Sequence, residues 1–289
     1  MTEEKKWELK DYKSDLKPIW CPGCGDFGVL NSLYKALTAL QLDPKDTAVI
    51  SGIGCSSRLP GYLNTYGFNS IHGRAIPIAS GVKLGNPDIE VIAVGGDGDG
   101  FSIGGGHIAH AARRNINMTY IVMDNQIYGL TKGQLSPTSE LRLKTKTSKY
   151  GSIDTPVNPV SLCLAYGVSF IARTYSGNPK HMVEMITQGI KHEGFSFIHC
   201  LSPCVTFRGK EQYDYFNDNT ELVPKQHDPA NKGQALAIGE SMTPMYLGAI
   251  YHNHFTTYED RLADFREKHK KTDGKKLLDK YRIQKYDEK

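Results

Sequence analysis

Four cysteines stand at positions where they could bind one metal centre. Cys21 and Cys24 lie three residues apart in Cys-Pro-Gly-Cys-Gly, a spacing at which two thiolates can hold the same centre. Cys55 and Cys204 each follow a strand-like run and are flanked by Gly or Pro, where loops at the carboxyl edge of a parallel sheet gather ligands. We expect these four to form one set. The cysteines alone leave open an iron–sulfur cluster, a zinc ion and a redox-active dithiol.

The two remaining cysteines are better explained by packing. Cys200 lies inside a β-branched and aromatic run, and Cys163 lies between Leu162 and Leu164 in an apolar helical pattern. A buried thiol in such a place behaves as a small apolar side chain. We therefore expect neither of them to bind metal.

Polar side chains also follow two neighbouring strand-like runs. The first run leads into Gly-Asp-Gly-Asp-Gly (96–100), and the second leads into Asp-Asn-Gln-Ile-Tyr-Gly (124–129). The 28 residues from Asp97 to Asn125 fit one βαβ crossover, which places both at adjacent strand ends. Such oxygen ligands suit Mg²⁺ with substrate phosphates. The glycines let a diphosphate approach the backbone, and a helix that starts near Gly105 points its amino end at the charge.

Two other patterns compete for the same region. Gly104-x-Gly106-x-x-Ala109 matches a dinucleotide fingerprint, with Asp124 at a suitable distance, but nine residues separate it from the end of its strand. We therefore favour the diphosphate interpretation over NAD(P). His107 and His110 have helical spacing but no third ligand, so packing or capping explains them better.

The elements that must position these residues alternate along the chain. Strand-like runs cover 48–53, 89–94, 119–124, 168–172 and 195–201, and helical patterns cover 27–42, 107–114 and 179–192. This alternation predicts an α/β fold with a doubly wound, mostly parallel sheet. The segment 126–159 is too long for an ordinary connection, and this length predicts a functional loop. We expect a domain over 1–204 and a C-terminal extension over 205–289, packed on that domain and on a partner.

Composition excludes several classes of protein. The 289 residues are 39% hydrophobic, enough for a sizeable core, and no apolar run is long enough to span a membrane. The first residues lead into no apolar signal segment, and six cysteines without a secretory context suggest a cytoplasmic protein. The net charge of +4 comes from the tail, where residues 261–289 hold 11 Lys and Arg against 6 Asp and Glu. Without a basic folded face, nucleic-acid binding is not expected.

Taken together, the motifs resemble the β subunit of the 2-oxoacid:ferredoxin oxidoreductases. Gly96-Asp97-Gly98 followed by Asp124-Asn125 is similar to a magnesium–thiamine diphosphate motif, with Asp in place of the first Asn, as this family also shows. The other matching motifs are Cys-Pro-Gly-Cys-Gly (21–25), Gly-Cys-Ser-Ser-Arg (54–58), His-Gly-Arg-Ala (72–75) and Tyr-Gly-Leu-Thr-Lys-Gly-Gln (128–134). They occur in order from Trp20 to Cys204, and they are specific as a set.

The resemblance implies binding sites for three groups, which are Mg²⁺, thiamine diphosphate and an iron–sulfur cluster. Mg²⁺ would be held by the Asp97 and Asn125 side chains and the Ile127 carbonyl, in the diphosphate-binding half of a thiamine diphosphate fold. The cofactor would be lined by Gly96, Gly98, Asp99, Tyr128, Gly129 and Leu130, with Cys55 and His72 close by. One [4Fe–4S] cluster would be held by Cys21, Cys24, Cys55 and Cys204.

The resemblance also implies a reaction and partners. The expected activity is coenzyme A-dependent oxidative decarboxylation of 2-oxoglutarate, or the reverse carboxylation of succinyl-coenzyme A, with ferredoxin as the external electron carrier. Pyruvate or a range of 2-oxoacids is the alternative. His72 is a catalytic candidate, and Lys132 or Arg58 could bind a distal carboxylate. A larger α subunit, or a fused γα chain, would supply the activating glutamate in a dimer of heterodimers.

Two hypotheses of other classes remain at the level of the sequence. A non-redox thiamine decarboxylase or carboligase would need no four-cysteine set. A four-cysteine zinc module that only binds partners would leave the glycine–aspartate loop without a role.

Overall fold

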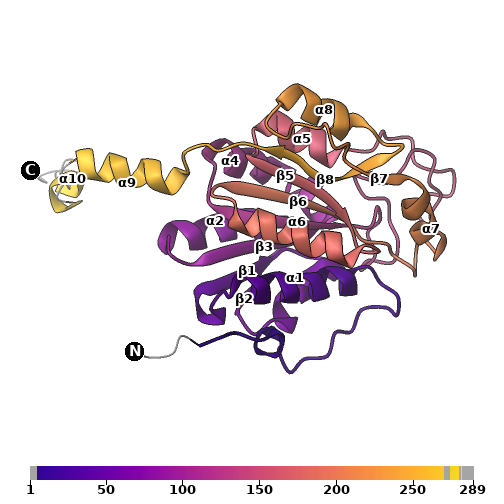
Figure 1. Cartoon of the computed structure of the whole chain (residues 1–289), viewed down its shortest axis with the longest axis horizontal. Helices are drawn as coiled ribbons and strands as arrows, with labels where there is room; N and C mark the ends of the chain where they lie inside the picture. Colours follow the sequence, from indigo (N-terminus) through magenta and orange to yellow (C-terminus); the bar gives the residue numbers. More distant parts are fainter. Residues whose placement is uncertain (1–4, 270–273, 280, 282–289) are drawn as a thin grey trace, which may run out of the picture.

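The apolar runs of the sequence become the central strands of one eight-stranded sheet. The computed structural model describes residues 5–269, 274–279 and 281. Across the sheet the strands follow the order β2-β1-β3-β4-β6-β5-β8-β7 (Figure 1). Their bounds are β1 Thr47–Ser51, β2 Tyr66–Asn69, β3 Glu90–Gly96, β4 Met118–Asp124, β5 Phe170–Tyr175, β6 Phe195–Leu201, β7 Thr220–Leu222 and β8 Met245–His252. All pairings are parallel except that of β5 with β8, which confirms a mostly parallel α/β fold.

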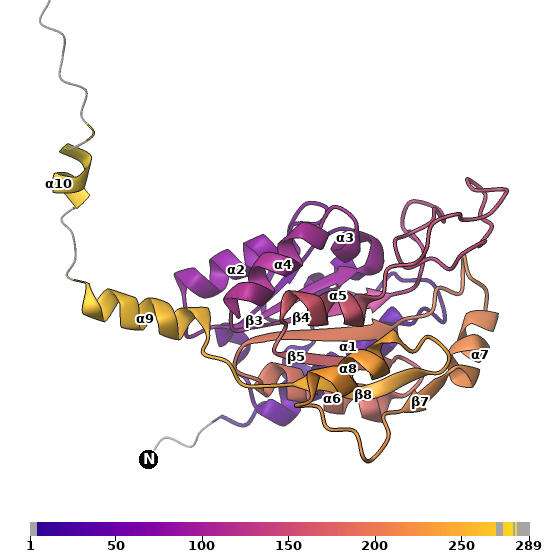
Figure 2. The same ribbon diagram turned by 90° about the horizontal axis from the view of Figure 1, so that it is seen from above.

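Helices cover both faces of this sheet (Figure 2). The two largest hydrophobic clusters divide them, with α1 and α6 on one face and α2, α4, α5 and α8 on the other. The arrangement is the doubly wound one that the alternation predicts. The helices are α1 Asp26–Leu40, α2 Ala75–Gly85, α3 Asp97–Phe101, α4 Gly105–Arg114, α5 Pro159–Tyr166, α6 Pro179–Lys191, α7 Glu211–Asp218, α8 Lys232–Glu240, α9 Tyr258–Lys268 and α10 Gly274–Asp279, with short 3₁₀ helices η1 Leu9–Tyr12, η2 Pro44–Asp46 and η3 Cys55–Tyr62.

The central strands are apolar without interruption because both of their faces are buried. In β3, Ile92 and Val94 pack in the cluster with α1, whereas Val91 and Ala93 pack in the cluster on the opposite face. This two-residue period places successive side chains on opposite sides of the sheet.

The parallel strands bring four loops to one edge. β3 pairs with β4 up to Gly96 opposite Met123, and β4 pairs with β6 up to Asp124 opposite Leu201. The segments that follow β1, β3, β4 and β6, from Gly52, Asp97, Asn125 and Ser202 onward, therefore meet at the carboxyl edge, where α/β sheets bind ligands.

The chain after Cys204 contributes to the sheet itself. β8 runs antiparallel beside β5, and β7 pairs with β8, so two of the eight strands come from the segment expected as an extension. The sequence analysis predicts neither strand. The division at residue 204 stays a prediction, and both parts share one sheet.

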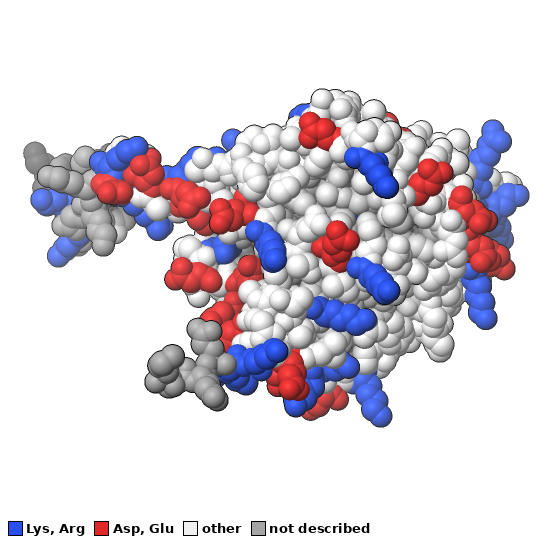
Figure 3. Space-filling view, viewed as in Figure 1, with Lys and Arg blue, Asp and Glu red and all other residues white. Residues whose placement is uncertain are grey.

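Helix α9 projects from the body of the molecule (Figures 1 and 2). None of its side chains is buried, although its first turn is attached where the Tyr258 amide donates to the Asn115 carbonyl at 3.2 Å. In Figure 3, Lys and Arg are scattered among acidic and uncharged side chains over the middle of the visible face, and several of them lie together at its right edge. The basic tail falls partly on 270–273, 280 and 282–289, outside the described residues. No helix in the described part is long and apolar enough to cross a bilayer.

Candidate functional site

All four cysteines of the predicted set line one cavity of about 300 Å³ at the carboxyl edge of the sheet. Two of them flank the backbone of Gly129: a Cβ at this glycine would lie 3.5 Å from Cys55 Sγ and 3.7 Å from Cys204 Sγ. Cys200 and Cys163 are buried in β6 and α5 and do not line the cavity. The structure thus brings together the four thiols that the spacing and loop positions select.

Short backbone contacts hold the cysteine loops against each other. The Gly25 amide donates to the Pro203 carbonyl at 3.0 Å, which joins the Cys24 turn to the Cys204 loop. A Cβ at Gly25 would lie 2.7 Å from backbone atoms of residues 202 and 203, so this approach requires glycine. On the other side, the Trp20 indole N–H donates to the Cys55 carbonyl at 2.8 Å.

The environment of the cysteine cavity disfavours the charged thiolate forms of its cysteines unless a metal centre is bound. Burial, and to a smaller extent nearby Asp26 and the other thiols, raise the pKa of Cys55 to about 12. Burial also raises the pKa of Cys24 and of Cys204. Metal binding reverses this preference, because a bound cation stabilises the thiolate forms. The donor set therefore fits a cationic centre with sulfur ligands.

The four thiols do not lie as close together as the ligands of a single zinc ion. In tetrahedral zinc sites with Zn–S bonds of about 2.3 Å, the sulfurs lie only about 3.8 Å apart. Among the described residues, the one group of three or more His, Cys, Asp or Glu side chains close enough for a single ion consists of histidines elsewhere in the chain. The four cysteines do not belong to such a group.

Two buried carboxylates meet beside this cavity. Asp97 begins α3 and Asp124 ends β4, and each is only 2% exposed. The Thr138 hydroxyl lies 3.0 Å from Asp97 Oδ2 and 2.8 Å from Asp124 Oδ1, and its single proton can serve only one of them. Burial, and then Asp124, raise the pKa of Asp97 to about 7. A cation bound at Asp97 would stabilise its ionised form.

Asn125 and the residues after it form the opposite wall. The Asn125 Oδ1 accepts a hydrogen bond from the Ile127 amide at 3.0 Å, which turns the chain after β4. The Tyr128 hydroxyl donates to the Gly98 carbonyl at 3.1 Å. A Cβ at Gly98 would lie 2.2 Å from the Tyr128 ring, so only glycine allows this packing.

These residues enclose a second cavity of about 360 Å³. The volume lies in the usual range for cofactor sites. Of the residues predicted for cofactor and magnesium, those that line it are Cys55, His72, Gly96, Asp97, Gly98, Asp99, Asn125, Ile127, Tyr128, Gly129 and Leu130. This cavity shares Cys55, Asn125, Gly129 and Leu130 with the cysteine cavity, so the two spaces are adjacent.

Asp99 has a second task besides lining the cavity. Its Oδ1 accepts hydrogen bonds from the Ile53 amide at 2.8 Å and the Gly73 amide at 2.7 Å. His72 Nδ1 lies 3.1 Å from the same oxygen. Asp99 therefore ties the loops after β1 and β2 to α3, and it orients His72 at the cavity wall.

The two basic side chains that could bind the distal carboxylate of the substrate line a different cavity from His72. Arg58 and Lys132 are exposed and line the cysteine cavity, whereas His72 lines the cofactor cavity. Leu130, which is half exposed, lines the cysteine cavity with them and belongs to the wall that the two cavities share. The catalytic roles of Arg58, Lys132 and His72 stay predictions.

Several residues that support the site escaped the sequence analysis. Thr138 belongs to the long loop 126–159, whose length is the only signal for it. His199 donates from Nε2 to Asp124 Oδ2 at 2.8 Å, because its Nδ1 accepts from Arg173 Nε at 3.2 Å. Gln212 of α7 accepts from the Cys204 amide at 2.8 Å and donates to the Asn125 carbonyl at 3.0 Å. No local motif marks these last residues.

Asp26 is a further buried carboxylate that the sequence analysis missed. It begins α1 and lines the cofactor cavity, and its Oδ1 accepts from the Ser202 hydroxyl at 2.7 Å while Oδ2 has no partner. Burial raises the pKa of Asp26 to about 6. Its position directly after the Cys-Pro-Gly-Cys-Gly segment is the one signal that could have suggested it.

Comparison with known proteins agrees with this architecture. Residues 52–200 match the family "Thiamine pyrophosphate enzyme, C-terminal TPP binding domain", and residues 204–267 match the family of the C-terminal part of the pyruvate ferredoxin oxidoreductase beta chain. The chain is 41% identical over 265 residues to subunit beta of 2-oxoacid:ferredoxin oxidoreductase 2 from Aeropyrum pernix, covering 87% of this chain and 86% of that one.

Other relatives carry a narrower name. The 2-oxoglutarate oxidoreductase subunit KorB of Mycobacterium tuberculosis is 47% identical over 206 residues, which cover 71% of this chain and 55% of that one. A solved structure of 2-oxoglutarate:ferredoxin oxidoreductase from Magnetococcus marinus, with 2-oxoglutarate, coenzyme A and succinyl-CoA bound, superposes with a TM-score of 0.92 at 41% identity and covers 98% of both chains.

Proposed function

The chain belongs to the family of 2-oxoacid:ferredoxin oxidoreductase β subunits, and it is therefore one subunit of an oxidoreductase. We propose that it forms part of an enzyme that oxidatively decarboxylates 2-oxoglutarate. In this reaction coenzyme A takes the succinyl group, CO₂ leaves, and two electrons pass to ferredoxin. The same enzyme would catalyse the reverse carboxylation when reduced ferredoxin is supplied.

One observation carries this proposal: the cofactor cavity and the cysteine cavity share a wall. Cys55, Asn125, Gly129 and Leu130 line both spaces. An oxidoreductase that removes electrons from a bound intermediate needs its electron acceptor next to the reacting atoms. A non-redox thiamine enzyme has no use for four thiols at this place.

The residues present fit thiamine diphosphate and Mg²⁺. Asp97, the Asn125 side chain and the Ile127 carbonyl would hold the ion, and the glycine loop at 96–98 would receive the diphosphate. When bound, thiamine diphosphate supplies the carbon nucleophile and the electron sink of the reaction. The chain positions Asp97 through Thr138, and it presents His72 at the cavity wall through Asp99.

The cysteine cavity fits a [4Fe–4S] cluster. Cys21, Cys24, Cys55 and Cys204 would each provide one thiolate. Because the four thiols are not gathered closely enough for a single ion, their arrangement supports a cluster over one zinc ion. The wall that this cavity shares with the cofactor cavity supports an electron-transfer role.

The preference for 2-oxoglutarate rests on the relatives and on the available cations. Relatives named KorB and the structure solved with 2-oxoglutarate support this substrate. Arg58 or Lys132, both at the cysteine cavity, would bind the distal carboxylate that pyruvate lacks. A broad-range or pyruvate-specific enzyme is the alternative to be tested.

We further propose that the chain works with a larger α, or fused γα, subunit in a dimer of heterodimers, and that ferredoxin binds from outside. Relatives named as β subunits support a partner subunit. All six cysteines are free of disulfides, which supports a reducing cytoplasmic location.

The test of the substrate is an anaerobic assay of the co-expressed two-subunit complex. Ferredoxin reduction would be followed with coenzyme A and, in turn, 2-oxoglutarate, pyruvate and a branched-chain 2-oxoacid. We expect the highest kcat/KM with 2-oxoglutarate, and a larger rise in KM for 2-oxoglutarate than for pyruvate in Arg58→Gln or Lys132→Gln. Equal kcat/KM values across the panel would support the broad-range alternative.

The magnesium assignment has its own test. In Asp97→Ala the ion loses its carboxylate ligand, so we expect thiamine diphosphate to be lost on gel filtration while the fold, followed by circular dichroism, is kept. Asp88→Ala is the matched control, because Asp88 is exposed and lies outside both cavities. Normal cofactor retention and activity in Asp97→Ala would contradict the assignment.

A further inference from the structure

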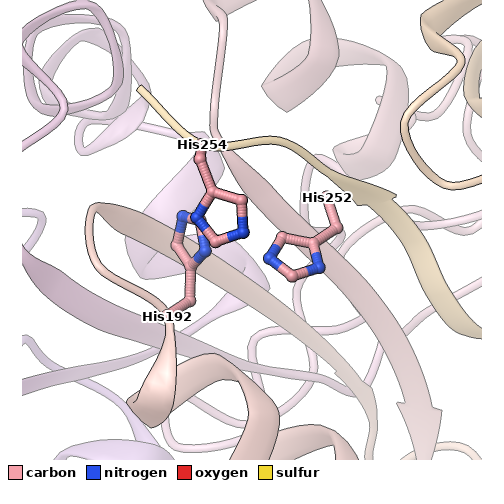
Figure 4. Close-up of side chains that lie close together, drawn as sticks. All are labelled: His192, His252 and His254. Carbon is pink, nitrogen blue, oxygen red and sulfur yellow. The ribbon is translucent and has the colours of Figure 1, made fainter. Parts of the chain in front are cut away.

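Three histidines meet at the edge of the sheet opposite the cofactor cavity. His192 follows α6, His252 ends β8, and His254 comes two residues later (Figure 4). One ligand nitrogen of each lies within 4.8 Å of those of the other two. His252 pairs with Phe170 at the start of β5, whereas the cofactor cavity lies where the parallel strands end, roughly 20 Å away by strand length.

The hydrogen bonds around His192 determine which of its nitrogens is free. The Asn115 Oδ1 is an acceptor, because it receives the Phe195 amide at 2.9 Å while Asn115 Nδ2 donates to the Phe255 carbonyl at 2.9 Å. The Ser169 hydroxyl donates to this Oδ1 at 2.7 Å or to the Phe195 carbonyl at 3.1 Å. Its oxygen must then accept from His192 Nε2, 2.7 Å away.

His192 Nδ1 therefore carries a lone pair and no proton. The side chain is only 5% exposed, and this nitrogen has no hydrogen-bond partner. An imidazole whose far N–H is held by a neutral oxygen is the usual arrangement of a histidine metal ligand. The unpartnered lone pair of a buried ring is thus the second observation, beside the clustering, that indicates a ligand.

The other two rings complete the donor set. His252 Nε2 is also buried without a partner, and His254 is exposed, which gives an ion a route from solvent. Burial and the neighbouring histidines lower the pKa of His192 to about 4, and burial also lowers the pKa of His252. Burial thus favours the neutral form of both rings, which is the form that binds metals.

We propose that His192, His252 and His254 form a binding site for a divalent transition metal, with Zn²⁺ as the ion that fits best. Three neutral imidazoles suit zinc, whereas Mg²⁺ and Ca²⁺ prefer oxygen ligands. In tetrahedral zinc sites with Zn–N bonds of about 2.0–2.1 Å, the nitrogens lie about 3.3 Å apart. The ligand nitrogens of the three rings lie within 4.8 Å of one another, so ion binding would draw the rings closer together. Water would occupy the fourth position.

The consequence of this site is structural. It would join the turn after α6 to the end of β8, and so fix the segment that leads to α9 against the sheet. Since zinc would bind only the folded chain, it would stabilise that chain in proportion to the logarithm of its concentration over its dissociation constant. The site is independent of the cofactor cavity and of the proposed reaction.

The experiment uses the anaerobic two-subunit complex with its cluster and Mg²⁺ in place. Zn²⁺ is titrated in, loosely bound ion is removed by gel filtration, and zinc per β chain is measured by mass spectrometry. We expect one zinc per β chain more in the wild type than in His254→Gln. X-ray absorption should show nitrogen ligands. Removing a residue that only hydrogen-bonds to a metal ligand weakens metal binding about 10–100-fold. Removing a histidine ligand itself should weaken zinc binding at least as much.

His254→Gln is the safest variant, because its side chain is exposed, and His252→Gln is the second. His110→Gln is the matched control: His110 is also exposed, and it lies outside the group. We expect zinc to raise the melting temperature of the wild type and of His110→Gln, and to leave that of His254→Gln unchanged. Equal zinc content in the wild type, His252→Gln and His254→Gln, or no zinc in the wild type at tenfold excess, would overturn the proposal.

Discussion

Thr138 shows how one hydroxyl can position a proposed metal ligand. It lies between Asp97 and Asp124, and Asp124 is held from its other side by His199. The chain Arg173–His199–Asp124–Thr138 therefore extends from the sheet core to the proposed magnesium ligand. Each member fixes the orientation of the next, and only the last contacts Asp97.

We expect Thr138→Val to weaken Mg²⁺ and thiamine diphosphate binding while leaving kcat at saturating cofactor near the wild-type value. Loss of the bridging hydroxyl removes one of the hydrogen bonds that orient the Asp97 carboxylate, and such outer-shell losses typically weaken metal binding by about 10–100-fold. The cofactor concentration for half-maximal activity measures the change. Thr147→Val, at an exposed threonine in the same loop, is the control, and an equal shift in both variants would contradict the role of Thr138.

The cysteines give a second test at the scale of the residue. Cys204→Ala should lose iron and the broad visible absorption, because a proposed cluster ligand is removed. Cys200→Ala should keep both: Cys200 is buried in β6 and lines neither cavity. The two residues lie four positions apart, so the pair is a matched comparison. If Cys200→Ala is bleached and Cys204→Ala is not, the ligand assignment is wrong.

At the scale of the element, the glycine loop depends on a close approach between α3 and the turn after β4. The Tyr128 ring lies where a side chain on Gly98 would be, and the Tyr128 hydroxyl donates to the Gly98 carbonyl. The turn itself closes where the Tyr128 amide donates to the Gln134 carbonyl at 2.9 Å. This packing brings Asp97 and Asn125 to the two sides of one cavity.

We expect Gly98→Ala to displace Tyr128 and to abolish cofactor retention, because the new methyl group would lie 2.2 Å from the ring. Gly106→Ala is the matched control within helix α4, since no heavy atom lies within 4 Å of its Cβ position. That change should raise the melting temperature slightly, through the better helix propensity of alanine. Retention of thiamine diphosphate by Gly98→Ala, measured after gel filtration, would refute the packing argument.

At the scale of the whole molecule, we propose that this chain forms one wall of the site and that the partner subunit completes it. No glutamate lines the cofactor cavity in the described part of the chain. A general base must lie within hydrogen-bond reach of the group that it serves, and in this family the activating glutamate is expected from the partner subunit. Projecting helix α9 and the half-exposed Leu130 offer surface for that partner.

The isolated chain should therefore be catalytically silent. It would be purified with its cluster intact and supplied with Mg²⁺, thiamine diphosphate, coenzyme A, 2-oxoglutarate and ferredoxin. We expect turnover at least about 10²-fold below that of the co-expressed complex, the lower range for loss of an acid–base group. Comparable turnover would show that one chain holds the complete site.

Neighbouring residues encode the parts of this protein that could be predicted without coordinates. A buried strand followed by glycines and aspartate marks its own end, and Cys-x-x-Cys places two thiols together whatever the fold. The five central strands, and the residues that line the two cavities, could therefore be predicted, and the alternation of strands and helices then predicted that the loops meet at one edge.

Tertiary packing, in contrast, selects the distant side chains that support those residues. These contacts join residues that are far apart in the sequence: Thr138 contacts Asp97 across 41 residues, Gln212 contacts Asn125 across 87, and Asp26 contacts Ser202 across 176. No periodic pattern encodes such contacts. The same holds for β8, which joins the sheet antiparallel to β5, and for the three histidines that this pairing brings together. Local propensity acts over a few residues, whereas these contacts depend on which surfaces the folded chain leaves free to pack.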